Sequence, residues 1–197
     1  MVNNFERISR IMKFNNPDDF YFVQIIKRRK DNPGLSRDMK WINNYFVYNL
    51  EYFKEKEADV VEECTKNNAR AYIHLNVRNA KKVALYTLKN LTDYIINGDY
   101  KAAKKAYTTS CGQHHSDPDK KWIIDIDTPD VEIQTLIFNH VVDLHRQVDP
   151  KGEKYLCHGF IPTKHGVHLV TNPFRLDQFK FKDVDIHKDN PTVLFIP

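Results

Sequence analysis

The sequence KKWIIDID, from Lys120 to Asp127, decides how the rest of this chain is interpreted. Side chains alternate between the two faces of a β-strand, so Asp125 and Asp127 would share one face. Same-face neighbours lie roughly 6–7 Å apart on a strand that rises about 3.3 Å per residue, which suits one divalent cation or a close pair of cations. Without a cation the two carboxylates would repel each other. We therefore predict a strand with a two-carboxylate site, the alternative being a strand end with two solvated acids.

Length and composition indicate a globular chain. The 197 residues form one large domain, or a compact domain with an added lobe. A content of 41% hydrophobic and 28% charged residues excludes a disordered protein. No apolar run approaches the ~18 residues of a membrane span, and residues 1–16 lack the apolar core of a signal peptide. We expect a cytoplasmic protein.

The charge of the chain is mildly basic, with a formal net charge of +4. That balance suits an anionic partner such as a nucleotide or a nucleic acid, but it does not select one. Lys and Arg are dense over residues 27–30, 81–82 and 101–105. Such runs are typical of solvated faces, so they support a nucleic-acid partner only in combination with other features.

The cysteines are predicted to be free thiols, because three of them make no even disulfide set and cytosolic thiols are usually reduced. Two of them lie beside histidines, in Cys111-Gly112-Gln113-His114-His115 and in Cys157-His158. These are residue types that bind zinc. The pattern lacks a second C-x-x-C or H-x-x-x-H pair, so it favours ordinary thiols and loop histidines over a zinc site.

Apolar periodicity predicts an alternation of helices and strands. Helical spacing is found over 3–14, 51–67, 80–96 and 100–107, and a further helix is expected to begin at Thr128, its N-cap, with Pro129 in the first turn. Strands are predicted over 19–29, 41–50, 69–78, 120–127, 155–161, 167–171 and 192–196, with a loop over 108–120 and a turn over 149–152. This pattern indicates an α/β or α+β domain.

The predicted strand over 69–78 has an unusual polar face, made of Arg70, Tyr72, His74, Asn76 and Arg78. Two arginines, a histidine and an asparagine are more than solvation of a strand requires. We interpret this face either as a surface that meets an anion or as an exposed face of the sheet.

A second segment with chemical potential is PTKHGVHLV, residues 162–170, in which a glycine turn precedes a strand. Gly166 removes a Cβ where a phosphate could approach the backbone. Lys164 and His168, with His165 between them, offer cationic or hydrogen-bonding groups to polyphosphate oxygens. The alternative is a hairpin with a satisfied histidine.

A third carboxylate comes from the acidic segment 182–190, in which Asp185 and Asp189 are the candidates. Acids from separate strands, a glycine turn with a histidine, and nearby basic residues are together the components of a metal-dependent phosphoryl or nucleotidyl transfer site.

These motifs carry a resemblance to a known family. The ordered set Ile124-Asp125-Ile126-Asp127, Gly166-Val167-His168 and Val184-Asp185-Ile186 resembles the D-x-D, small-residue-x-His and hydrophobic-Asp motifs of archaeo-eukaryotic-type primases and primase–polymerases, and looks most like their small phage-encoded members. The likeness runs from about Phe20 to the C-terminus. It implies an α+β primase-type catalytic core, with a mixed or antiparallel sheet flanked by helices, in one two-lobed domain whose lobes are residues 1–110 and 111–197.

The resemblance also implies roles for individual residues. Asp125 and Asp127 would bind Mg²⁺ or Mn²⁺, with Asp185, or alternatively Asp189, as third ligand, and His168 would contact the phosphates of the incoming nucleotide. The nucleotide site would comprise Lys164, His165, Gly166, His168 and Arg78, with Arg70 as an alternative to Arg78. The family often has Ser where this chain has Gly166, so a contact from that hydroxyl is lost.

The function implied is a template-dependent nucleotidyltransferase that joins nucleoside triphosphates on single-stranded DNA by two-metal catalysis. Its partners would be the template, the nucleotides and a helicase or other replication proteins, in the cytoplasm of a bacterial host cell if the protein is phage-encoded. The chain has no cysteine cluster of the kind that many relatives use in initiation, so synthesis of a primer from its first nucleotide is less well supported than the transferase core. Two other functions remain open: a metal-dependent nuclease or phosphohydrolase, and a non-catalytic nucleic-acid-binding module.

Overall fold

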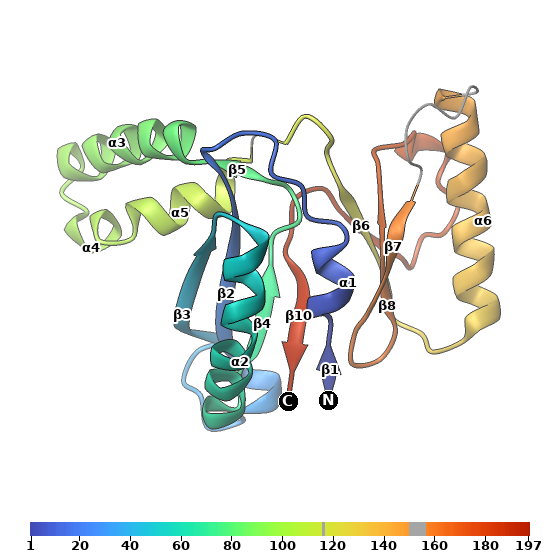
Figure 1. Cartoon of the computed structure of the whole chain (residues 1–197), viewed down its shortest axis with the longest axis horizontal. Coiled ribbons are helices and arrows are strands. Elements are labelled where there is room, and N and C mark those ends of the chain that lie inside the picture. Colours follow the sequence, from blue (N-terminus) through green and yellow to red (C-terminus); the bar gives the residue numbers. More distant parts are fainter. Residues whose placement is uncertain (116, 150–156) are drawn as a thin grey trace.

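The protein is an α+β structure in which two antiparallel sheets lie side by side (Figure 1). The computed structural model describes residues 1–115, 117–149 and 157–197. The first sheet has the order β1 (Val2–Asn3), β10 (Thr192–Ile196), β4 (Arg70–Ile73), β2 (Asp19–Arg28), β3 (Met39–Val47), and β5 (Arg78–Asn79) pairs with the start of β2. The second sheet has the order β7 (Cys157–Pro162), β8 (Val167–Thr171), β6 (Trp122–Ile126), β9 (Asp185–His187).

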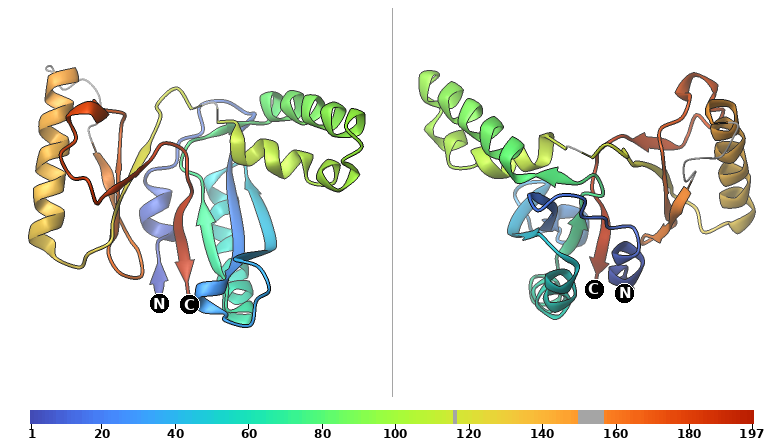
Figure 2. Two further views of the ribbon diagram at one scale, coloured as in Figure 1. Left: turned by 180° about the vertical axis from the view of Figure 1, so that it is seen from behind. Right: turned by 45° about the horizontal axis from the view of Figure 1, so that its top comes forward.

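Helices lie on the outer sides of the two sheets, except the first, which lies between them and contacts both β10 and β7. The helices are α1 (Phe5–Ser9), α2 (Leu50–Asn67), α3 (Ala80–Ile96), α4 (Tyr100–Ala103), α5 (Ala106–Gln113) and α6 (Val131–Val148), with short 3₁₀ turns at Arg29–Asp31 and Leu176–Gln178. Figure 2 shows from two further directions that α6 and the arm formed by α3, α4 and α5 lie at opposite ends of the molecule.

Each face of the first sheet has its own core. Val23, Ile25, Ala71 and Ile73 pack in one core with the apolar side of α2, which includes Phe53. On the other face, the aromatic start of β2 packs against α3 and α5 through Phe20, Phe22, Val83 and Cys111. The arm therefore covers only the end of this second face where β2 begins.

The two faces of the second sheet pack in different cores, as the alternation of β6 predicts. Trp122, Ile124 and Ile126 pack in the core that α6 covers. Ile123 belongs instead to the core of the first sheet, so Asp125, two residues further along the strand, faces the first sheet too. The alternation over Lys120–Asp127 thus decides which way the acids face.

Several predicted elements are confirmed. The strands over 19–29, 41–50, 167–171 and 192–196 and the helices over 51–67 and 80–96 are present within a few residues. The strand over 155–161 is present from Cys157 onward, and residues 150–156, with most of the predicted turn over 149–152, lie outside the described residues.

Other predictions were wrong. The first helix spans only Phe5–Ser9, and the predicted loop over 108–120 contains most of α5. The strand over 69–78 breaks after Ile73, where the Asn76 amide pairs with the main chain of Lys121: its Oδ1 accepts from the Lys121 N–H at 2.6 Å and its Nδ2 donates to the carbonyl at 3.1 Å.

The start of α6 and the division into lobes also need correction. Asp130, not Thr128, is the N-cap of α6, because its carboxylate accepts from the N–H groups of Glu132 and Ile133. The proposed lobe boundary at 110/111 does not follow the sheets: β10, from the end of the chain, lies between β1 and β4 in the first sheet, and α5, which packs on α3, spans the boundary.

Candidate functional site

A cavity of about 870 Å³ opens between the two sheets. Asp125, Asp127 and His168 line it from the second sheet, together with Lys164 and His165 from the turn between β7 and β8. The opposite wall comes from β2, the start of β3, β4 and the 3₁₀ turn that follows β2. This wall includes Ile26, Arg28, Lys30, Asp31, Met39, Arg70 and Tyr72.

The three sequence motifs meet on neighbouring strands. In the antiparallel register, Asp125 of β6 is the Cα partner of His168 on β8 and of Asp185 on β9. Cross-strand partners share a face of the sheet, so the acid, the histidine and the second acid start from one surface. The Asp185 side chain is exposed and does not line the cavity, whereas His168 is buried.

The Asp125 carboxylate lies in an environment that shifts its pKa. Its Oδ1 lies 3.3 Å from His168 Nε2, but it is buried and has no partner in hydrogen-bonding geometry. The nearby His168 holds the pKa of Asp125 below its ordinary value, although burial acts in the opposite direction. The other ring nitrogen of His168, Nδ1, lies 2.7 Å from Thr192 Oγ1, which fixes the orientation of the imidazole.

The carboxylates fit a divalent ion that is shared with a substrate. Asp125 Oδ1 is a buried oxygen without a hydrogen bond, and Asp127 is an exposed carboxylate just beyond the end of the same strand. Over residues 1–115, 117–149 and 157–197, no three His, Cys, Asp or Glu side chains converge as a metal-binding group. Mg²⁺ is commonly bound by one or two carboxylates plus substrate phosphates and water. The donor set matches that mode and not a closed protein cage.

The opposite wall of the cavity is cationic. Arg70 donates from Nε and Nη2 to the two carboxylate oxygens of Asp31, at 2.7 and 2.6 Å, and Lys164 Nζ lies 3.7 Å from the same group. The Arg70 hydrogen bonds lower the pKa of Asp31. Arg28 and Lys30 also lie on this wall, so three cations of the wall, together with Lys164 of the β7–β8 turn, surround one engaged carboxylate. The wall therefore retains positive charge for an anionic ligand.

Sequence reasoning missed Arg28 and Lys30, which it treated as part of a solvated basic run. The alternation of β2 could have found Arg28, because it shares a face with Ile26. Tyr72, whose hydroxyl accepts from Arg28 Nη1 at 3.1 Å, came from the predicted polar face of the strand over 69–78. Arg70 and Tyr72 of that face do reach the cavity.

Gly166 has a different task from the one predicted. A Cβ at this position would lie 1.9 Å from the carbonyl oxygen of Ile126 and 2.8 Å from the Thr128 nitrogen. The close approach is thus between the β7–β8 turn and the end of β6, not between the turn and a phosphate. Two hydrogen bonds close the turn: the Thr163 N–H donates to the Gly166 carbonyl oxygen, and the Gly166 N–H donates to Thr163 Oγ1. Gly166 does not line the cavity, but the two residues before it do.

Arg78 and Asp189 are corrected from ligand contacts to a structural pair. Arg78 is fully buried, with Nη2 3.0 Å from Asp189 Oδ2 and Nε donating to the Cys111 carbonyl at 2.7 Å. Asp189 also accepts from Asn76 Nδ2 at 2.9 Å. Neither side chain lines the cavity, and the pair joins α5 to the segment before β10.

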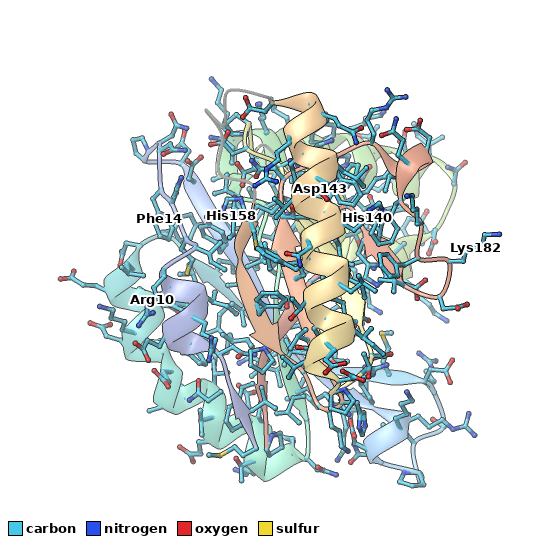
Figure 3. The ribbon with its side chains drawn as sticks, turned by 90° about the vertical axis from the view of Figure 1, so that its right-hand side faces the viewer. Arg10, Phe14, His140, Asp143, His158 and Lys182 are labelled. Atoms are coloured by element: carbon cyan, nitrogen blue, oxygen red, sulfur yellow. The ribbon has the colours of Figure 1, made fainter. Side chains whose placement is uncertain are left out.

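The cysteine–histidine pattern does not form a zinc site among the described residues. His114 stacks on Tyr86, with ring centroids 3.6 Å apart. His158 Nε2 lies 2.7 Å from Asn172 Oδ1, and in the view of Figure 3 His158 and His140 lie on opposite sides of α6. Cys111 is buried in α5. These groups contact partners that differ from one another.

The comparisons with known proteins add no relative. No family model, curated protein or solved structure matches this chain. The structure itself contains, in the part of the chain that it describes, no helix long and apolar enough to cross a membrane. The functional argument therefore rests on the geometry of the cavity.

Proposed function

We propose that this chain is the catalytic core of a template-dependent nucleotidyltransferase of the primase–polymerase type, which joins nucleoside triphosphates on single-stranded DNA. The observation that carries the proposal is the polarity of the cavity between the sheets. Asp125 and Asp127 lie on one wall, and Arg28, Lys30 and Arg70 lie on the other. A triphosphate with divalent ions matches that arrangement, since its ions face the acids and its remaining charge faces the cations.

The residues that line the cavity have separate roles in this proposal. Asp125 and Asp127 would hold Mg²⁺ or Mn²⁺, which when bound lowers the pKa of an attacking hydroxyl and neutralises charge on the triphosphate. Lys164 and Arg70 would bind phosphate oxygens and orient the nucleotide. His168, held by Thr192, would donate to the nucleotide from the ring nitrogen that now faces Asp125. Positioning and charge neutralisation are most of what phosphoryl transfer requires of a protein.

The test is extension of a labelled primer on a single-stranded template with nucleoside triphosphates and Mn²⁺ or Mg²⁺. The wild type is compared with D125A/D127A and with D143A/D177A, which removes two exposed acids elsewhere. We expect elongated products from the wild type and the control. The D125A/D127A rate should be lower by more than about 100-fold, because even the outer-shell partners of a bound metal are worth 10–100-fold.

Two other results would assign a different function. Products shorter than the input, lost in D125A/D127A, would indicate a nuclease that uses the same carboxylates. Equal binding of single strands by both proteins, with no product under any condition and no Mn²⁺ binding by electron paramagnetic resonance, would leave a binding module. Either result would overturn the proposal.

A further inference from the structure

An exposed tryptophan lies next to the cavity. The chain has two tryptophans. Trp122 is only 9% exposed and packs edge-on against Phe174, whereas Trp41 on β3 is 47% exposed. Tryptophan has one of the largest apolar surfaces of any side chain and is enriched at interfaces, so a half-exposed indole beside a cavity is a candidate contact for a ligand.

The strand register places Trp41 in line with the cavity wall. Met39 is the Cα partner of Arg28, and Trp41 is the partner of Ile26. Ile26, Arg28 and Met39 all line the cavity. Partners across a pair of strands share a face, so Trp41 lies on the same face of the sheet. Because β3 is the edge strand of the first sheet (Figure 1), the cavity wall continues as an open apolar strip of Met39 and Trp41 to that edge.

The charge around this strip identifies its partner. Residues 27–40 contain six Lys or Arg and two Asp, an excess of four that equals the net charge of the whole chain. Asp31 is paired with Arg70, and Asp38 lies 3.8 Å from Arg29. An exposed aromatic ring beside concentrated positive charge is the combination that binds single-stranded nucleic acid, in which bases stack on the ring and phosphates meet the cations.

We propose that Trp41 and Met39 form a stacking platform for a base of a single-stranded nucleic acid, with Arg28 and Lys30 contacting its phosphates. The platform would guide the template strand along β3 into the cavity. This inference rests on the proposed function for the identity of the strand as a template. The binding itself requires neither metal nor nucleotide.

The test measures the anisotropy of fluorescently labelled dT₂₀ and rU₂₀ with the full chain in the absence of metal and nucleotide. W41A should bind about 5- to 150-fold more weakly than the wild type, the range that stacking on an aromatic ring contributes per base. W41F should stay within about threefold of the wild type, because its ring still stacks. The control L88A removes an exposed apolar side chain from α3 and should bind as the wild type does.

The salt dependence gives a second readout. For single strands, the slope of log K against log salt is about −0.7 per phosphate contact, so K30Q should reduce the slope by about 0.7.

The platform and the proposed function fail separately. If W41A binds both oligonucleotides as tightly as L88A and the wild type, the platform is wrong even when primers are extended. Tighter binding of duplex than of single strand would also overturn it. If binding depends on Trp41 but no product forms with any metal, the proposed catalytic function is wrong and the platform stands.

Discussion

Replacement of Gly166 by alanine tests the packing on which the site depends. The new Cβ would lie 1.9 Å from the Ile126 carbonyl oxygen and 2.8 Å from the Thr128 nitrogen. Both neighbours are backbone atoms and cannot rotate away. The β7–β8 turn must therefore move by about 1 Å from the end of β6 before the shorter contact reaches the 3.0 Å that real Cβ atoms respect.

The expected cost follows from overpacking. Extra methylenes in well-packed sites destabilise proteins by typically 1–3 kcal/mol, and a rigid backbone neighbour places G166A near the upper end, at about 3 kcal/mol. For a chain of this size that corresponds to a fall of roughly 6–12 °C in Tm. Since Ile126 lies between Asp125 and Asp127, the same displacement would separate the carboxylates from Lys164. Primer extension should fall further than the loss of stability alone explains.

Urea and thermal denaturation followed by circular dichroism measure this cost. The matched control is G112A, a glycine in α5 where a new Cβ meets nothing within 4 Å. It should be neutral or stabilising by up to about 1 kcal/mol, because alanine favours helix over glycine. A G166A protein as stable as the wild type would show that the turn and the end of β6 are not in close contact, and the site geometry derived from that contact would be wrong.

Three further predictions concern buried polar and charged side chains. R78M leaves Asp189 without its buried partner and should destabilise the protein by about 3–5 kcal/mol in urea denaturation, whereas R175M, at a fully exposed pair, should leave the stability nearly unchanged; similar values for both would refute the structural role of the Arg78–Asp189 pair. Burial, and then the charge of Arg78, lower the pKa of His74 to about 3. Between about pH 6.5 and pH 3 the unfolded chain binds a proton at His74 that the folded chain does not. The free energy of unfolding should therefore decrease as the pH is lowered through this range, by up to about 1.4 kcal/mol per pH unit. Denaturation at a series of pH values should show a shallower pH dependence for H74Q. T192V removes the hydroxyl that orients His168 and should lower kcat with little change in Tm, whereas T192S should restore the rate; equal rates for all three proteins would contradict that positioning role.

The sequence predicted the parts of the site that depend on local periodicity. Alternation over Lys120–Asp127 placed both acids on one face, and the spacing of apolar residues located α2, α3 and most strands. These patterns are properties of a few consecutive residues, because burial on one side of a strand or helix repeats with a fixed period. The partnership of Asp125 with His168 was expected from the motifs, and the strand register is consistent with it.

Tertiary structure decided whether each charged side chain lines the cavity or is buried in an ion pair. Arg28, Arg70 and Arg78 are chemically identical, yet two line the cavity and one is buried against Asp189, which is 111 residues away in the chain. No local pattern specifies such a partner, since the cost of burying a charge depends on what the folded chain brings beside it. The same holds for Gly166, whose need for a missing Cβ arises from Ile126, and for Trp41, which local alternation places on a strand but only the sheet order leaves exposed at an edge. Local periodicity thus determined the strands and their faces, and the packing of distant segments determined the cavity.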